Sequence, residues 1–451
     1  MKMKTMIILF TMVVSIAILA GCGNSGSTPQ TATTADVTTT AGVTTTVGET
    51  TTQSEETAAA TQDNPSLSGE LTYVVFSGEP YNSSWMAMFD QFTAKTGVTV
   101  HLDAVPWENL REKQTLELAS GSGAYDVIYS HPSWYKQFAA NGYLLPIDDY
   151  CTQADKDKFV PSLLGLFEYN DKIYGLPDWI TTIMIAYRTD LFEEKGVDKP
   201  ESWEEVLKLA ELFTDGDNLY GIVFPAKNVA SLAGTFLTNL LANDAWILDS
   251  NGNPTMDTPE ALETVQYFEK LSKFAPPGYL NFHWDEVRTL AGNGKAAMAM
   301  LLTVSMRIFS DPDSSQVTGV WDYVPMKQKT TGGAIDCWSW AVVSSSKNIE
   351  AAGELVKFMT DTDVQLQLTK LNGTVGATKG YYESPEPMNL LPYLPAMNEA
   401  FAGKSLMLPT WESWQSEQDE LEVSLQKMFS GEMTAEQVVT AVQEKMVANR
   451  K

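Results

Sequence analysis

The part of the chain that can fold is predicted to be an α/β protein with two lobes. Short apolar segments such as "ELTYVVFS" and "YDVIYS" alternate with amphipathic segments of helical period. This alternation is typical of parallel sheets covered by helices. The foldable part runs from about residue 69 to 451. Because one hydrophobic core rarely organises so long a segment, we expect two lobes of ordinary size.

The individual elements follow from local patterns. "ELTYVVFS", "GVTVHLDAV" and "YDVIYS" are predicted strands, and a helix follows each of the first two. "ESWEEVLKLAELFTDG" begins with the capping pattern Ser202-x-x-Glu205 and carries apolar residues at helical spacing. "DTPEALETVQYFEKLSKF" has Thr258 as its expected N-cap and a proline in its first turn. "SKNIEAAGELVKFMTD" and "TAEQVVTAVQEKM" are predicted to be further amphipathic helices.

The beginning of the chain predicts export and a lipid anchor. The basic start "MKMK" is followed by an almost entirely apolar run from Met6 to Ala20, and the run ends in "LAGC". Such a run is short for a membrane span and typical of a secretory signal. Its end resembles the bacterial lipobox, so we expect residues 1–21 to be the signal peptide and Cys22 to be lipidated. A plain signal peptide with an incidental cysteine is the alternative.

Residues 22–68 are predicted to form a disordered tether. They are rich in Thr, Ala, Gly, Ser and acidic residues, and no Lys or Arg occurs between Thr5 and Ala94. A segment of this composition cannot bury enough apolar surface to fold. As a flexible coil of about 45 residues it would span roughly 35–40 Å on average. We therefore expect a domain held at the outer face of the cell membrane, in a Gram-positive bacterium.

Charge and cysteine content narrow the possible partners. The formal net charge is −27, which argues against nucleic acids and anionic membrane surfaces as binding partners. It also disfavours an anionic ligand, although a local pocket can differ from the whole. Beyond Cys22 only Cys151 and Cys337 remain, so the chain is no disulfide scaffold. A Cys151–Cys337 bridge stays open at this point.

Catalytic and metal-binding motifs are missing from the sequence. HExxH, GxSxG, GxxxxGK[ST] and GxGxxG do not occur. The segment 249–260 comes close to a calcium-binding EF-hand loop, but Pro254 stands where the sharp turn needs glycine. A hairpin turn leading into a helix cap is the favoured interpretation. We expect no metal and no cofactor, and a carbohydrate-active enzyme that uses two of the many carboxylates remains an alternative.

Tryptophan residues stand at the ends of several predicted elements. In "DCWSW", strand alternation places Asp336, Trp338 and Trp340 on one face. Further tryptophans lie in "HPSWYKQF", "YGLPDW", "PPGYLNFHWDE" and "LPTWESW". Core packing accounts for any single one of them. Together, beside polar residues, they predict a cleft that stacks on the C–H faces of a sugar or polyol.

Four segments in order resemble one protein family. They are "LASGSGAYDVIYSHPSWYKQFAANGYLLPID", "DKIYGLPDWITTIMIAYRTDLFEEKGVDKPESWEEV", "GNGKAAMAM" and "GGAIDCWSWAVVSSSKNIEAAGELVKFM". The chain resembles the bacterial extracellular solute-binding proteins of family 1, the lipoprotein subunits of ABC sugar importers, over nearly all of residues 70–451. "PPGYLNFHWDEV", "FSDPDSSQV" and "CWSWAVVSSSK" are similar to the branch that binds sorbitol and mannitol. Arg188 departs from the family pattern, where asparagine is usual, and Arg307 near the site loop is a second unusual feature.

The resemblance implies a two-lobed, periplasmic-binding-protein-like α/β fold with a hinge and a ligand cleft between the lobes. The chain would cross near residues 180, 335 and 385. The implied N-terminal lobe comprises residues 70–180 and 335–385, and the C-terminal lobe comprises 181–334 and 386–451. The implied function is capture of a sugar, oligosaccharide or polyol by a monomeric, non-enzymatic lipoprotein that delivers it to an ABC permease. A sugar-sensing or adhesion lipoprotein with the same fold is a further alternative.

Matching the segments to the family implies a set of ligand contacts at strand ends and chain crossings. The expected contacts are Glu79, Trp107, Ser130, His131, Trp134, Asp178, Trp179, Trp284, Thr303, Ser305, Arg307, Asp336, Trp338 and Trp411.

Overall fold

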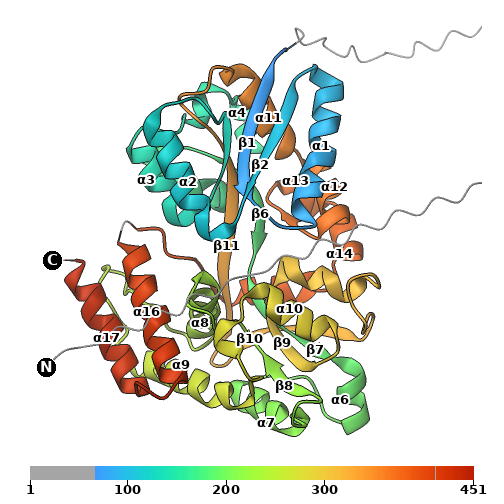
Figure 1. Cartoon of the computed structure of the whole chain (residues 1–451), viewed down its shortest axis with the longest axis vertical. Coiled ribbons are helices and arrows are strands. Elements are labelled where there is room, and N and C mark those ends of the chain that lie inside the picture. The colour runs from blue at the N-terminus through green and yellow to red at the C-terminus, as the bar shows by residue number, and fades with distance from the viewer. Residues whose placement is uncertain (1–66, 412, 451) are drawn as a thin grey trace, which may run out of the picture. The chain divides into compact units, whose positions relative to one another are not determined.

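The computed structural model describes residues 67–411 and 413–450 (Figure 1). The predicted signal peptide, Cys22 and almost all of the predicted tether lie outside the described residues. No helix in the described part of the chain is long and apolar enough to cross a membrane.

The first lobe is built on three parallel strands. β1 (Glu70–Phe76) pairs with β2 (Thr99–Val105) on one side and with β3 (Val127–Ser130) on the other. The connections are α1 (Tyr81–Thr96) and α2 (Trp107–Ser120), as parallel strands require. The predicted strand–helix alternation is therefore confirmed in this lobe.

The second lobe has a mixed sheet instead of the parallel sheet expected from the sequence. Its strands are β7 (Ile183–Arg188), β8 (Tyr220–Val223), β9 (Ala296–Leu302) and β10 (Trp321–Lys327). β8 and β9 are parallel, but β7 runs antiparallel to both β9 and β10. β7 follows directly on β6 of the first lobe, so no strand–helix–strand crossover makes it parallel to β8, β9 and β10.

Helices cover the second lobe and close its core. They are α6 (Thr189–Lys195), α7 (Trp203–Phe213), α8 (Ala230–Ala242), α9 (Pro259–Leu271), α10 (Trp284–Gly292), α16 (Trp414–Phe429) and α17 (Ala435–Ala448). α8 is buried along almost its whole length, and α16 packs against both α8 and α17. One face of α16 is therefore turned toward the interior of the molecule.

Two strands run through the middle of the molecule and connect the lobes (Figure 1). β6 (Leu176–Thr181) belongs to the first lobe and is followed after one residue by β7. β11 (Thr331–Val342) pairs with β10 and β13 (Lys404–Met407) up to Ile335, and with β6 and β3 from Asp336 onward. The third passage runs through α14 (Glu386–Leu390).

The remaining elements surround these sheets. In the first lobe they are α3 (Pro132–Ala140), α4 (Gln153–Asp157), α5 (Pro161–Leu164), β4 (Glu168–Tyr169), β5 (Lys172–Ile173), α11 (Ile349–Met359), α12 (Thr362–Asn372), β12 (Val375–Gly376) and α13 (Lys379–Glu383). The second lobe adds the 3-10 helix Thr303–Ser310 and α15 (Leu394–Ala402).

Several local predictions are confirmed. Ser202 and Thr258 cap α7 and α9 by accepting hydrogen bonds from backbone N–H groups. Asp249 Oδ1 accepts the N–H groups of Asn251 and Asn253, both at 2.8 Å. Residues 249–260 therefore form the expected turn and helix cap rather than a calcium loop.

The two cysteines of the folded part are free and buried. The bridge between Cys151 and Cys337 that the sequence left open is not formed in the structure.

Candidate ligand-binding cleft

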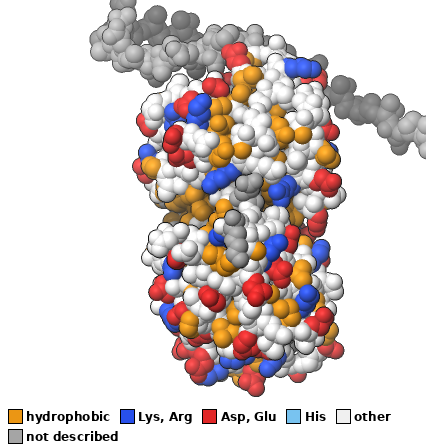
Figure 2. Space-filling model, turned by 90° about the vertical axis from the view of Figure 1, so that its left-hand side faces the viewer, with side chains coloured by type: hydrophobic (Ala, Val, Ile, Leu, Met, Phe, Trp, Pro, Cys, Tyr) orange, Lys and Arg blue, Asp and Glu red, His pale blue; other side chains and the backbone are white. Residues whose placement is uncertain are grey.

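A cavity of about 1040 Å³ lies between the two lobes. It is lined from the first lobe by the β1–α1 loop and the starts of α2 and α3, and from the second lobe by α8, α10 and α16. Figure 2 shows a recess at the junction of the lobes in which hydrophobic side chains are visible. The volume lies at the upper end of the roughly 300–1,000 Å³ typical of small-molecule sites, so the cavity has room for a ligand of at least one sugar unit.

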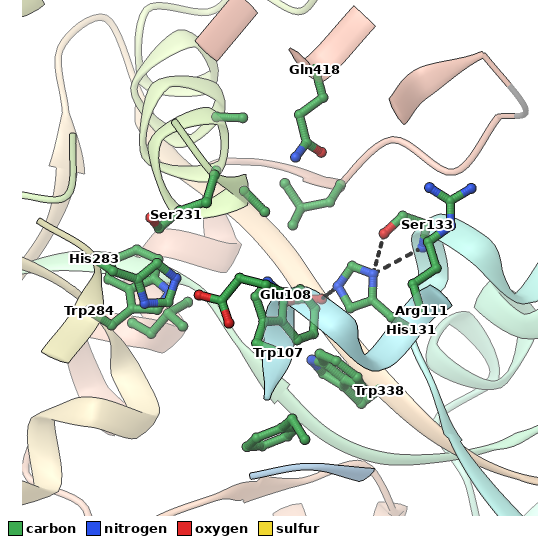
Figure 3. A pocket seen from close by; sticks show the side chains of 18 of the residues that line it. Trp107, Glu108, Arg111, His131, Ser133, Ser231, His283, Trp284, Trp338 and Gln418 are labelled. Atoms are coloured by element: carbon green, nitrogen blue, oxygen red, sulfur yellow. Dashed lines mark hydrogen bonds and ion pairs between the residues drawn. The ribbon is translucent and has the colours of Figure 1, made fainter. Parts of the chain in front are cut away.

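The first-lobe wall of the cavity is aromatic. The indole of Trp338 stacks on Tyr129, with ring centroids 4.6 Å apart and an interplanar angle of 13°. Trp107 lies edge-on to Trp338 at 5.2 Å, and Trp134 does so at 6.0 Å. Figure 3 shows Trp107, His131 and Trp338 gathered on one side of the cavity, with Ser231, His283 and Trp284 on the other. Flat aromatic faces of this kind suit the C–H faces of a sugar or polyol.

The pentapeptide "DCWSW" divides between cavity and core. Asp336 and Trp338 line the cavity, and Trp338 is 5% exposed. Trp340 is fully buried and stacks on Tyr73 at 4.1 Å, behind the cavity wall. The alternation of β11 places all three side chains on one side of the strand, but only the end near the crossing reaches the cleft.

His131 and Asp336 form a polar pair beside the aromatic wall. His131 Nε2 lies 3.1 Å from Asp336 Oδ1. The backbone N–H of Ser133 donates to His131 Nδ1 at 3.2 Å, which places the proton of a neutral imidazole on Nε2, facing the carboxylate. The pair leaves acceptor capacity on Asp336 for ligand hydroxyl groups.

Nine of the fourteen predicted contacts line the cavity. They are Glu79, Trp107, His131, Trp134, Trp179, Trp284, Ser305, Asp336 and Trp338. Trp179 is parallel to Tyr81, with ring centroids 6.2 Å apart. Its Nε1 is buried without a hydrogen-bond partner among the described residues, so it is available to a ligand oxygen.

The other five predicted residues, Ser130, Asp178, Thr303, Arg307 and Trp411, do not line the cavity. Ser130 is fully buried at the end of β3 because the alternation of the strand turns it away from the side on which His131 emerges. Asp178 is buried and accepts a hydrogen bond from the Tyr129 hydroxyl at 3.0 Å. It therefore supports the ring on which Trp338 stacks.

Thr303, Arg307 and Trp411 each form a hydrogen bond outside the cavity. The Thr303 hydroxyl is 2.8 Å from that of Thr181, at the crossing between the lobes. Arg307 donates to the carbonyl of Lys370 at 3.1 Å, which links the second lobe to α12. Trp411 donates to Glu417 at 2.8 Å, in a separate surface pocket.

The sequence prediction missed the contribution of α16 and α8. Trp414, Gln415, Gln418, Asp419 and Glu422 line the cavity from α16, and Ser231 does so from the first turn of α8. The only local signal is a polar stripe at helical spacing, which is also what a solvent-facing helix shows. The packing of distant segments was needed to identify these residues.

The lining is strongly acidic. Its charged side chains, histidines aside, comprise seven carboxylates (Glu79, Glu108, Glu112, Asp285, Asp336, Asp419 and Glu422) and two guanidiniums (Arg111 and Arg288).

Polar contacts bridge the two lobes at the edge of the cavity. Arg111 of α2 donates to Gln415 of α16 at 3.2 Å, and Lys227 of the second lobe lies 3.8 Å from Glu108. Such contacts, which are partly exposed to solvent, contribute little free energy each. They can therefore break and form again without a large cost.

Burial shifts the pKa of Asp178. The loss of hydration raises it to about 7, against the lowering effect of the nearby Trp340 indole and of the hydrogen bond from Tyr129. In the unfolded chain an Asp carboxyl ionises near pH 4. Between these two values only the folded state holds the proton, so the free energy of unfolding falls as pH rises through this window.

Asp178→Asn should therefore flatten the pH dependence of stability. From pH 5 to pH 6 the ionisation of Asp178 lowers the stability of the wild type by at most about 1.4 kcal/mol, and the asparagine variant lacks this contribution. Urea unfolding of both proteins at pH 5, 6 and 7 measures the difference. Equal slopes for the two proteins would contradict the raised pKa.

The sequence matches one protein family and is similar to individual known proteins. The model of the family "Bacterial extracellular solute-binding protein" matches residues 77–366. The erythritol/L-threitol-binding protein of Mycolicibacterium smegmatis is 24% identical over 320 residues, which cover 65% of this chain and 67% of that protein.

Two solved structures share the arrangement of lobes. Maltose-bound MalE3 of T. maritima has a TM-score of 0.78 at 20% identity, covering 84% of this chain and 100% of that one. A ribitol complex of an ABC transporter solute-binding protein from Agrobacterium radiobacter K84 has a TM-score of 0.74 at 21% identity, covering 85% and 98%. The family match extends over most of both lobes, and the chain belongs to the bacterial extracellular solute-binding proteins.

Proposed function

We propose that this protein captures a sugar, an oligosaccharide or a polyol in the cleft between its lobes and delivers it to the permease of an ABC importer. The observation that carries the proposal is the wall of Trp107, Trp134 and Trp338 beside the His131–Asp336 pair. Aromatic faces bind the C–H side of a sugar ring or polyol chain, and the polar pair binds its hydroxyl groups. The names of the relatives point the same way, to erythritol, ribitol and maltose.

Ligand binding would favour the closed arrangement of the lobes. A ligand that touches both walls gains contacts only when they are close together, so it shifts the population toward closure. We place the lobe boundaries at residue 182, between Ile335 and Asp336, and over 384–393, where the strand pairing or the packing changes lobe. The permease would recognise the closed form.

A thermal-shift screen with monosaccharides, oligosaccharides and polyols tests the function. A ligand that binds only the folded state raises the unfolding temperature, and the shift grows with the logarithm of its concentration relative to the dissociation constant. A shift with at least one compound of these classes is the expected result. No shift with any of them, together with a shift for an amino acid or a metal ion, would overturn the proposal.

We expect the protein to be a monomeric binding protein and not an enzyme. The ligand should therefore be released from the cleft chemically unchanged. Mass spectrometry of the ligand after long incubation with the protein tests this. Steady formation of a hydrolysed or oxidised product would favour the carbohydrate-active enzyme.

We also propose that Cys22 is lipidated and anchors the protein to the outer face of the cell membrane of a Gram-positive bacterium. Cys22→Ser should abolish labelling by a palmitate analogue and release the protein into the medium. A matched Ser25→Ala control should remain at the membrane. Membrane retention of the Cys22 variant would contradict the proposal.

A further inference from the structure

A carboxyl group is buried in the second-lobe wall of the cleft without a cationic partner. Glu422 of α16 lines the cavity and is 2% exposed. It accepts a hydrogen bond from Gln418 Nε2 at 2.9 Å, and no Lys or Arg of the described residues forms an ion pair with it. Ionising a buried carboxyl is costly unless a cation is close. Burial, and then the neighbouring Asp419, accordingly raise the pKa of Glu422 to about 8.

The other charged residues of the cavity lining also favour a cationic ligand. Apart from Glu422, six carboxylates face only two guanidiniums in the cavity. Both guanidiniums already have partners, since Arg288 donates to Asp285 at 2.6 Å and Arg111 donates to Gln415 at 3.2 Å. The electrostatic potential inside the cleft is therefore negative. The aromatic faces of the opposite wall also attract positive charge.

A second, independent feature of this wall is a buried hydroxyl group without a hydrogen-bond partner in the part of the chain that the structure describes. Ser231 lies in the first turn of α8, the helix against which α16 packs. It lines the cavity and is 2% exposed, and its hydroxyl has no hydrogen-bond partner among the described residues. Buried hydroxyl groups are rarely left unpaired. The positive end of the α8 dipole favours a ligand oxygen at Ser231. Glu422, which is an acidic group, instead favours a positively charged group of the ligand.

We propose that the ligand carries a positively charged amino group and that Glu422 and Gln418 bind it, so that the ligand is an amino sugar or an amino polyol. Gln418 donates its amide N–H to Glu422, which leaves Gln418 Oε1 free as a second acceptor for the ammonium group. Figure 3 shows Gln418 pointing from α16 into the cavity. This inference rests on the proposed function and specifies the ligand class of the same cleft.

Pairs of compounds that differ only by the replacement of one or two hydroxyl groups by amino groups test the inference. The pairs are D-sorbitol with 1-amino-1-deoxy-D-sorbitol, D-glucose with D-glucosamine, and cellobiose with the β-1,4 dimer of glucosamine. Titration calorimetry at pH 7 should show that the wild type binds an amino compound at least about tenfold more tightly than its hydroxyl counterpart. N-acetyl-D-glucosamine, which is uncharged, should bind like glucose.

The variant Glu422→Gln keeps the shape of the side chain but removes its ability to carry a negative charge. It should lose about tenfold or more in affinity for the amino compound and clearly less in affinity for the hydroxyl counterpart. Glu420→Gln is the matched control, because Glu420 lies on the same helix outside the cavity lining and bonds to Ser424. It makes the same substitution of a glutamate by glutamine and should leave the preference intact.

The outcomes distinguish this inference from the proposed function. Equal or tighter binding of the hydroxyl compounds by the wild type overturns the amino-group inference while the sugar and polyol function stands. An unchanged preference in Glu422→Gln also overturns it. If no compound of either series binds although the thermal-shift screen finds another sugar or polyol, the amino-group inference fails. If that screen finds no such ligand either, the proposed function itself fails.

Folding of the variant is checked by its unfolding temperature without ligand. Because burial keeps Glu422 protonated near neutral pH, the amide should replace it with little loss of stability. Should the variant fail to fold, Asp419→Asn provides the same test at an exposed position of the lining. It should reduce the amino preference severalfold, and an unchanged preference overturns the inference.

Discussion

Replacement of Trp340 by alanine is expected to lower the free energy of unfolding by about 3–5 kcal/mol. The side chain is fully buried, is stacked on Tyr73 at 4.1 Å and meets Trp85 and Phe89 edge-on, each at 6.2 Å. Alanine would leave a cavity among these rings, and the surrounding sheet can close it only in part. Urea denaturation followed by circular dichroism and tryptophan fluorescence measures the loss.

Trp340→Phe is the control for this prediction. It keeps an aromatic ring on Tyr73 and should lose clearly less stability than alanine. Neither variant changes the cavity lining, so ligand affinity at low temperature should stay within about twofold of wild type. A midpoint of unfolding for Trp340→Ala equal to that of wild type would contradict the buried stack.

Replacement of Trp338 by alanine is expected to raise the dissociation constant about ten- to hundredfold, or 1–3 kcal/mol. Trp338 lies two residues from Trp340 on the same strand but lines the cavity, where we propose that its indole stacks on the ligand. Since it is also 95% buried against Tyr129 and Trp107, some stability should be lost as well. Calorimetric titration with the best ligand of the thermal-shift screen, well below the unfolding temperature, isolates the effect on affinity.

Two controls accompany the Trp338 variant. Trp338→Phe keeps a stacking ring and should recover much of the affinity. Trp411→Ala removes a tryptophan that the sequence placed in the site but that lies outside the cavity lining, and its affinity should match wild type. If Trp338→Ala binds normally but unfolds early, the aromatic wall is only core and the ligand binds elsewhere.

The sequence predicted which segments of the chain line the cavity better than it predicted which individual residues do. Strand alternation correctly grouped Asp336 with Trp338, because side-chain direction in a strand is a local property. His131 lines the cavity and Ser130 does not, although the two residues are adjacent and were predicted together. Ser305 and Thr303 divide in the same way because Thr303 pairs with Thr181 at the crossing. Proximity in a motif does not determine which of two neighbours faces the ligand.

The α/β class, the helix caps and the family were determined by the sequence alone. Each depends on periodicity, on capping residues or on motif order, which act over a few residues or are read along the chain. The antiparallel entry of β7, the free state of the two cysteines and the place of α16 in the cleft were decided only by the tertiary structure. Glu422 lies almost 350 residues after Glu79 in the chain and yet lines the same cavity, since long-range packing decides which polar face of a helix is buried against a cleft and which meets water.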